Sequence, residues 1–221
     1  VTAKTAQRIQ AAINETGYIP NLLAGGLATN KSKLVAVLIP QLVPAVFNGT
    51  IEAMVTELSA AGSVVMLGIT EFSSERADSL VMAALSRRAE AIIITGDVSP
   101  QTREILKKSK TSVIEIWDLS DDPIDIAVGF SHRDIGKDIA RFLKSKGYKR
   151  PHIVTTQTKR AEERFSAFKK EWYEQGGKHL TYDAMSLPLR FGQSREAFQT
   201  VLNLPKRPDV LICGADTLAL G

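Results

Sequence analysis

Short apolar runs alternate with amphipathic stretches from residue 34 to the end of the chain, and this alternation restricts the fold more than any other feature. We expect the apolar runs to form strands at Leu34–Ile39, Val64–Ile69, Ala91–Thr95, Val113–Trp117, Ile126–Phe130, His152–Thr156, Thr181–Met185 and Val210–Cys213. We expect helices between them at Phe47–Ala61, Glu75–Arg87, Pro100–Lys108, Arg133–Lys146, Glu162–Gln175 and Ser194–Leu202. Continuous apolar strands separated by helices are typical of a parallel sheet with helices on both faces, so the sequence predicts an α/β fold.

The alternation is interrupted once, near residues 118–131, where two predicted strands follow each other without a helix between them. We interpret this break as a crossover from one sheet to a second, which divides the core into residues 34–131 and 132–221. In such folds ligands bind outside the carboxyl ends of the strands. The sequence stops after one strand and a helix start, Cys213–Gly221, which would leave a sheet edge unpaired. We therefore expect it to be part of a longer protein.

Residues 1–33 differ from the rest of the chain. A helix is predicted over residues 1–17, with Thr2 or Thr5 as its cap: Ile9, Ala12 and Ile13 recur at helical spacing, and Gly17 marks its end. A second short helix is expected at Leu22–Thr29, but it contains two glycines that each cost about 1 kcal/mol relative to alanine. This helix therefore needs a partner to fold.

The same N-terminal segment is basic. Residues 1–33 contain four Lys and Arg and one Glu, so they carry most of the net charge of +4. The distribution fits a nucleic-acid role and also fits chance, and charge alone leaves both readings open.

The composition excludes several classes of protein. The single cysteine, Cys213, excludes an internal disulfide and a cysteine metal cluster, and it suits a reducing, cytoplasmic environment. The apolar runs are far shorter than the roughly 20 residues of a membrane span, and no secretory leader opens the sequence. Catalytic and phosphate-binding motifs are absent. We therefore expect no membrane association, no cofactor, no metal and no enzymatic activity.

Polar residues follow several predicted strands, at the end where a ligand cleft would lie. Each of them either faces a ligand or acts as a capping or loop residue, and position alone leaves both readings open. Their mixture of acid, cation and neighbouring aromatic rings suits a polar, hydroxyl-rich ligand. These residues are Asp97, Asp118, Ser131, His132 and Arg164.

Short motifs also occur in a fixed order along the chain. They are Gly17-Tyr18-Ile19-Pro20-Asn21, Asn21–Leu27, Val35–Pro40, Trp117-Asp118, Gly147-Tyr148-Lys149-Arg150, Arg164–Phe168 and Cys213–Gly221. Together they resemble the lactose-repressor (LacI/GalR) family of bacterial transcription regulators. The stretch Asp125–Phe130 is similar to gluconate-operon repressors within that family.

The resemblance implies a periplasmic-binding-protein-like core of two Rossmann-like subdomains, preceded at residues 1–30 by the end of a helical DNA-binding headpiece and a hinge helix. It implies contacts to operator DNA from Thr5, Tyr18, Asn21, Ala24, Leu27 and Ala28. It implies a ligand site formed by Phe47, Asp97, Trp117, Asp118, Phe130, Ser131, Arg164 and Asp216. A homodimer is implied as well.

The chain departs from the family pattern at three places. Gly25 stands where the hinge usually has Arg, which removes one expected contact to the DNA backbone. Ser131-His132 stands where many members have Asp-Asn, and Ala215 replaces the Asn of the usual C-x-N-D motif. These departures affect the expected ligand contacts.

The sequence therefore predicts a ligand-responsive bacterial transcription regulator, of the repressor type, whose core binds a small sugar or sugar acid and controls affinity for operator DNA. A periplasmic-type sugar-binding protein is the alternative, and an enzyme on the same scaffold ranks third. Apolar positions outside the core stripe of a helix, such as Met82, indicate either dimerisation through the first subdomain or core packing alone.

Overall fold

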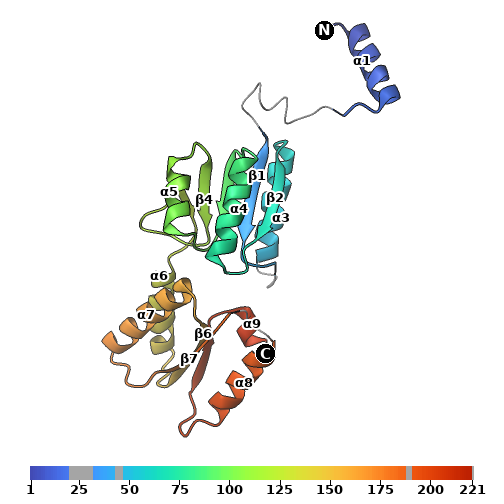
Figure 1. The fold of residues 1–221 in the computed structure, drawn as a ribbon. Coiled ribbons are helices and arrows are strands. Elements are labelled where there is room, and N and C mark those ends of the chain that lie inside the picture. Colours follow the sequence, from blue (N-terminus) through green and yellow to red (C-terminus); the bar gives the residue numbers. More distant parts are fainter. Residues whose placement is uncertain (20–31, 43–46, 188–190, 221) are drawn as a thin grey trace.

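The computed structural model describes residues 1–19, 32–42, 47–187 and 191–220, and its strands form two parallel sheets (Figure 1). The first sheet has the order β2-β1-β3-β4-β5, with strands β1 (Leu34–Ile39), β2 (Val64–Ile69), β3 (Ala91–Ile94), β4 (Ser112–Ile116) and β5 (Ile126–Val128). The second has the order β7-β6-β8, with strands β6 (Pro151–Thr156), β7 (Thr181–Met185) and β8 (Val210–Cys213). The predicted fold class is confirmed.

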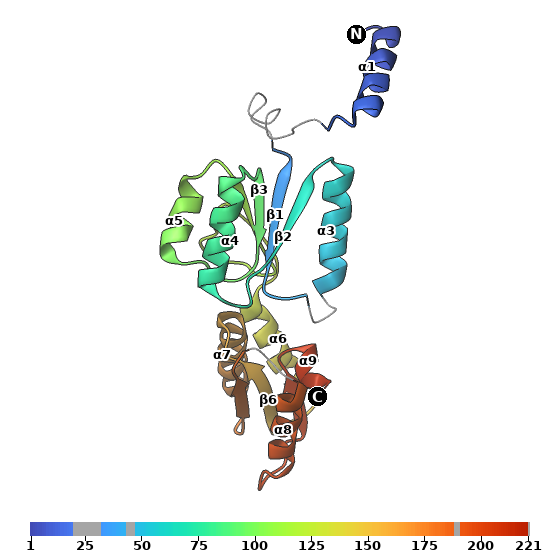
Figure 2. The same ribbon diagram turned by 45° about the vertical axis from the view of Figure 1, so that its right-hand side comes forward.

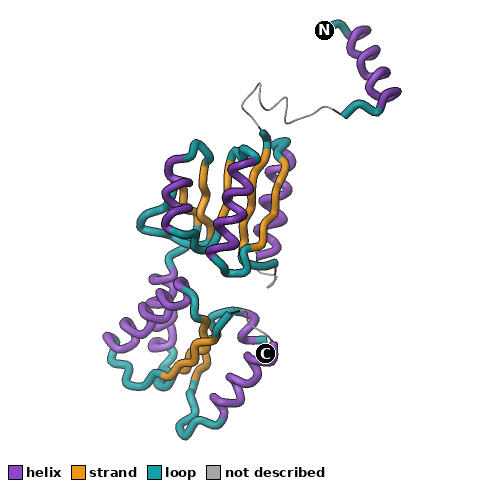
Figure 3. Tube along the Cα trace, viewed as in Figure 1, coloured by secondary structure: helices purple, strands orange, loops and turns teal. Residues whose placement is uncertain are grey.

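Helices connect these strands and cover the sheets. They are α1 (Ala3–Thr16), α3 (Asn48–Ala60), α4 (Ser74–Ser86), α5 (Pro100–Lys108), α6 (His132–Ser145), α7 (Lys159–Glu174), α8 (Phe191–Leu202) and α9 (Asp216–Ala219). Figure 2 shows α3 on one face of the first sheet and α4 and α5 on the other. In Figure 3 the strands of each sheet run side by side between helices.

The surroundings of strand β1 explain why its sequence is apolar without interruption. Ala36 and Leu38 are fully buried in one cluster with Val81 of α4 and Leu106 of α5. The alternate residues of β1 pack with Ile51 of α3 in a cluster on the opposite face of the sheet. Because successive side chains point to opposite faces, a strand covered by helices on both sides needs apolar residues throughout.

The second sheet has its own core, in which α6 and α7 pack closely together. Leu143, Phe168 and Trp172 are buried in it together with Ile153 of β6. A Cβ atom on Gly136 of α6 would lie 2.2 Å from the Arg164 carbonyl oxygen of α7. The two helix backbones therefore touch at a point that only glycine allows.

The predicted elements within the described residues are present, with shifts at their ends. The strand predicted at Ile126–Phe130 ends at Val128, and the helix predicted from Glu162 begins earlier, at Lys159. The earlier start follows from Thr158, whose hydroxyl oxygen accepts a hydrogen bond from the Ala161 N–H at 3.4 Å and caps the helix. The short helix predicted at Leu22–Thr29 lies outside the described residues.

The break near residues 118–131 contains a pair of strands of the first sheet and, after them, the crossover to the second sheet. Strand β5 pairs with β4, with Ile126 opposite Ile114, so both strands without a helix between them belong to the first sheet. The crossover follows β5, at residues 129–131. A Cβ atom on Gly129 would lie 2.3 Å from the Asp118 nitrogen, so glycine allows the chain to leave the sheet beside the end of β4.

Helix α1 buries none of its residues. Its start is capped by Thr2, and Gly17 ends it with a left-handed backbone, φ 64°, which glycine adopts without strain. The predicted helix at residues 1–17 is therefore confirmed, and its sequence encodes both of its ends.

Candidate ligand-binding cleft

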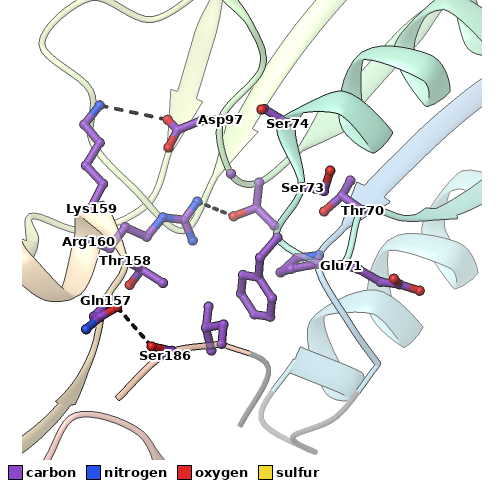
Figure 4. A pocket seen from close by; sticks show the side chains of 15 residues that line it. Thr70, Glu71, Ser73, Ser74, Asp97, Gln157, Thr158, Lys159, Arg160 and Ser186 are labelled. Atoms are coloured by element: carbon purple, nitrogen blue, oxygen red, sulfur yellow. Dashed lines mark hydrogen bonds and ion pairs between the residues drawn. The ribbon is translucent and has the colours of Figure 1, made fainter. Parts of the chain in front are cut away.

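A pocket of about 570 Å³ is lined by residues of both subdomains (Figure 4). Its walls are the segments that follow β1, β2 and β3 in the first sheet and β6 and β7 in the second. The carboxyl ends of parallel strands gather at one edge of a sheet, and these two edges face each other across the pocket. The cleft predicted at the strand ends is therefore present between the two sheets.

The wall on the first sheet is a strained turn after β2. Thr70 is buried, and the Glu71 N–H donates to the Pro40 carbonyl at 3.0 Å. Glu71 and Phe72 both have left-handed backbones, φ 51° and 60°, a conformation that costs a non-glycine residue about 1–2 kcal/mol. The turn ends at Ser73, which caps α4. The turn places Phe72 against the pocket, although the backbone conformation is unfavourable.

The wall on the second sheet is the start of α7. Lys159 and Arg160 line the pocket beside the capping residue Thr158. Gln157 accepts a hydrogen bond from the Ser186 hydroxyl at 3.1 Å, which ties the segment after β6 to the segment after β7. The N-terminal residues of α4 and α7 both line the pocket, and helix N-termini favour anions. The lining contains two cations, Lys159 and Arg160, and two carboxylates, Glu71 and Asp97. An anionic group is therefore favoured at the α7 side of the pocket, where the two cations and the helix end lie.

Arg160 also connects the two subdomains. Its Nε lies 3.6 Å from Oδ2 of Asp118. Its guanidinium also donates to the Thr95 hydroxyl, a bond drawn as the dashed line from Arg160 in Figure 4. Burial lowers the pKa of Arg160, and the charge of Asp118 partly offsets this effect. Lys159 makes a longer and more exposed contact, 4.0 Å, with Asp97. The start of α7 is therefore held against the ends of β3 and β4.

Arg164 lies one helical turn further along α7 and does not line the 570 Å³ pocket. Its Nη1 donates to the Gly214 carbonyl at 3.1 Å, and its Nη2 lies 3.1 Å from Nδ1 of His132. Burial and the charge of Arg160 both lower the pKa of Arg164. Arg164 therefore joins α7 to the start of α6 and to the segment after β8.

Of the other predicted ligand residues, the structure places only Asp97 and Asp118 in the cavities that the described residues form at this cleft. Asp97 lines the main pocket, and Asp118 lines a neighbouring cavity of about 70 Å³ together with Arg160. Phe47 and Trp117 line neither cavity; their rings contact each other at a tilt of 33°, with centroids 4.4 Å apart, beside the core of the first sheet.

Three predicted residues lie beside the crossover or at a helix start. Ser131 caps α6 by accepting from the Asp134 N–H at 3.0 Å. Phe130 is 45% exposed and packs edge-on against His132. Asp216 is exposed at the start of α9.

The predicted DNA contacts fall only partly within the described residues. Thr5 and Tyr18 are exposed, in α1 and just after it. Asn21, Ala24, Leu27 and Ala28 lie outside the described residues.

Several residues of the pocket were not predicted from the sequence. Thr70, Phe72, Gln157, Arg160 and Ser186 all line it, and all follow strands that were predicted with correct or nearly correct ends. Applying the strand-end rule to every strand would have selected them. Within the described residues, no group of His, Cys, Asp and Glu is arranged to hold a metal ion. No helix in that part of the chain is long and apolar enough to cross a bilayer.

Comparisons with known proteins agree with this architecture. The family model of periplasmic binding proteins and the sugar binding domain of the LacI family matches residues 32–221. The transcriptional regulator GntR of Escherichia coli (strain K12) is 26% identical over 219 residues, which cover 97% of this chain and 65% of that protein. GntR of Pseudomonas aeruginosa is 28% identical over 158 residues, which cover 71% of this chain and 46% of that protein.

A solved structure is also similar throughout. The crystal structure of a LacI family transcriptional regulator from Silicibacter pomeroyi has a TM-score of 0.90 and 31% identity, covering 100% of this chain and 67% of that one. The chain spans about half to two thirds of the length of the two curated relatives. The matched residues and the shared architecture show that the chain belongs to the LacI/GalR family and is close to GntR within it.

Proposed function

We propose that the chain is the ligand-binding part of a bacterial transcription regulator, of the repressor type, that binds a sugar or sugar acid and thereby controls affinity for operator DNA. The observation that carries this proposal is the pocket between the strand ends of two sheets, lined by hydroxyl groups and by Lys159 and Arg160. Its relatives are named transcriptional regulators, and we propose no enzymatic activity. We further propose a cytoplasmic location, since operator DNA is the partner.

The lining of the pocket supports a sugar acid as the ligand. Thr70, Ser73, Thr158 and Ser186 offer hydroxyl groups, and Phe72 offers an apolar surface for the carbon skeleton. The cationic start of α7 suits a carboxylate. We propose that Asp97, Asp118 and Arg164 contact the ligand when the cleft closes, together with Phe47, Trp117, Phe130, Ser131 and Asp216.

We propose that closure of the cleft is transmitted to DNA through residues 1–30. Residues 34–131 and 132–221 act as the two halves of the clamp, and the crossover at residues 129–131 is the connection between them. Thr5, Tyr18, Asn21, Ala24, Leu27 and Ala28 are the proposed DNA contacts, with Leu27 as the wedge in the minor groove. A ligand that binds the closed form better than the open form shifts the spacing of two hinges and so changes the affinity for DNA.

Two copies are required for this mechanism, and we propose that they pair through the first subdomain. Val55 of α3, Val64 and Leu67 of the edge strand β2, and Met82 of α4 are between 36% and 59% exposed. These apolar side chains lie on β2 and on the helices that flank it, at one edge of the sheet, where a second copy would cover them.

The proposed ligand is tested by titrating the chain with D-gluconate and, as a neutral control of the same carbon number, D-glucose. Gluconate is expected to bind and to compact the chain in small-angle scattering. Arg160→Gln removes a cation from the pocket and is expected to weaken gluconate binding by about 2 kcal/mol or more. Lys170→Gln, at an exposed position of the same helix, is the matched control and is expected to bind like the parent. Equal affinity for gluconate and glucose, or unchanged gluconate affinity in Arg160→Gln, would contradict a sugar acid in this pocket.

Regulation is tested on the full-length protein. Genomic DNA fragments that it captures are compared with and without gluconate. The proposal requires that gluconate changes the captured set in the parent and not in Arg160→Gln, while capture without gluconate is the same for both proteins.

A further inference from the structure

His132 is the first residue of α6 and stands where the chain enters the second subdomain. It is only 4% exposed, and its ring packs edge-on against the Phe130 ring with centroids 5.1 Å apart. A histidine buried at the junction of two subdomains is a candidate for a role beyond packing.

The hydrogen bond between His132 and Arg164 determines the protonation of the imidazole. Nδ1 of His132 lies 3.1 Å from Nη2 of Arg164. A guanidinium can only donate, so Nδ1 must be the unprotonated acceptor and the proton of the neutral ring must be on Nε2. The bond therefore exists only while His132 is neutral.

Arg164 is held by neutral groups. Its second bond goes to the Gly214 carbonyl at 3.1 Å, and within the described residues no carboxylate forms an ion pair with it. Its Nε is buried and has no hydrogen-bond partner there. Burial of a guanidinium without a counterion costs free energy. An anionic ligand would supply the missing counterion.

We propose that His132 is a positioning residue for Arg164. Neutral His132 holds the Arg164 guanidinium in the orientation that receives an anionic group of the ligand. Protonated His132 releases the guanidinium from that orientation. This inference rests on the proposed function, because Arg164 is a proposed ligand contact.

The charges around the imidazole decide when it titrates. Arg164 and Arg160 face it from α7, Asp118 faces it from the segment after β4, and Arg133 and Asp134 follow it on its own helix. Burial is the largest cause that lowers the pKa of His132, and the two facing guanidinium groups lower it further, whereas Asp118 raises it. The ring is therefore neutral near pH 7 and gains its proton below the ordinary value of 6.5. The resulting N–H then points at a guanidinium of like charge and separates the two side chains.

Two substitutions separate positioning from packing. His132→Asn keeps an acceptor near the position of Nδ1 but cannot titrate in this range, and His132→Leu keeps an apolar side chain but has no acceptor. His179→Asn removes an exposed histidine on the segment before β7 and serves as the matched control. All four proteins are titrated with D-gluconate between about pH 5.5 and pH 8, with circular dichroism recorded at each pH to show that they are folded.

The parent and His179→Asn are expected to lose affinity for gluconate by about tenfold per pH unit below the His132 pKa. His132→Asn is expected to keep its affinity at low pH, and His132→Leu to bind at least about tenfold more weakly at every pH. If His132→Asn loses affinity with pH as the parent does, or if His132→Leu binds like the parent near neutral pH, the inference is wrong.

A measurement without ligand separates this inference from the proposed function. Nitrogen NMR of the imidazole distinguishes an acceptor Nδ1 bonded to a cation from a free one. Replacement of Arg164 by Met is expected to change the Nδ1 resonance of His132 and to raise its pKa, since one facing cation is lost. An unchanged resonance and pKa would overturn the positioning contact. Failure of the parent to bind gluconate at any pH would instead count against the proposed ligand class.

Discussion

The Nε of Arg160 in α7 lies 3.6 Å from Oδ2 of Asp118, so an ion pair joins the second sheet to the end of β4 in the first. Both side chains are about one quarter exposed, at 25% and 26%. Arg160 lines the main pocket, and Asp118 lies beside it at the end of β4. A ligand in this pocket would therefore act directly on a contact that holds the two subdomains together.

Removal of this contact should loosen the link between the subdomains. Asp118→Asn leaves the largely buried Arg160 guanidinium with a neutral partner, and we expect a loss of about 1 kcal/mol in the free energy of unfolding. Urea titration measures this loss, and small-angle scattering should show a larger radius of gyration. Asp121→Asn is the control, because that side chain is 93% exposed and its contact with Arg133 is long, 3.8 Å. Equal stability of the two variants would mean that the Arg160–Asp118 pair contributes nothing.

Substitution by alanine at two helix glycines should change the stability of the chain in opposite directions. At Gly136 the new methyl group would meet the Arg164 carbonyl at 2.2 Å, so α6 and α7 must separate. We expect Gly136→Ala to destabilise the chain by about 2 kcal/mol or more. Gly49→Ala in α3 has no atom within 4 Å of the new methyl group and should stabilise by roughly 0.5–1 kcal/mol. Thermal unfolding of both variants checks the pair, and a stable Gly136→Ala would show that the helices can shift freely.

Acidification below about pH 6.5 should destabilise the fold. Burial lowers the pKa of His152 below its ordinary value of 6.5, as it does for His132. The unfolded chain therefore binds more protons than the folded chain below about pH 6.5, and the free energy of unfolding must fall as the pH drops through that value.

Urea midpoints measured between about pH 8 and pH 5 should fall on the acid side. His152→Gln removes one of the two groups and should reduce the pH dependence. A stability that is constant through this range would show that neither histidine is kept neutral by the fold.

Relief of backbone strain in the turn after β2 should raise stability and weaken ligand binding. Phe72 has φ 60°, so Phe72→Gly should relieve about 1 kcal/mol of backbone strain and raise the melting temperature. The same change removes an apolar wall of the pocket and should weaken gluconate binding. Arg88→Gly relieves similar strain at φ 57°, outside the pocket, and should stabilise without any effect on binding. Unchanged affinity in Phe72→Gly would exclude Phe72 from the site.

The sequence alone determined the order and position of the elements. Runs such as Leu34–Ile39 are apolar because helices cover both faces of the sheet, and this requirement can be read directly from the residues. Helix ends marked by local capping residues, such as Gly17 after α1, were predicted for the same reason: the signal is local. The start of α7 was missed because Thr158 was not recognised as its cap.

Only the tertiary structure decided which polar residues face the pocket. Arg160 and Arg164 are one turn apart at the start of α7. Arg164 was predicted as the ligand contact, whereas Arg160 lines the main pocket. The direction of each side chain depends on the rotation of α7 about its axis. That rotation is set by the close contact of Gly136 with the Arg164 backbone, between residues that are distant in the chain. Local patterns determine where a helix forms, but long-range packing determines which of its side chains meet a ligand.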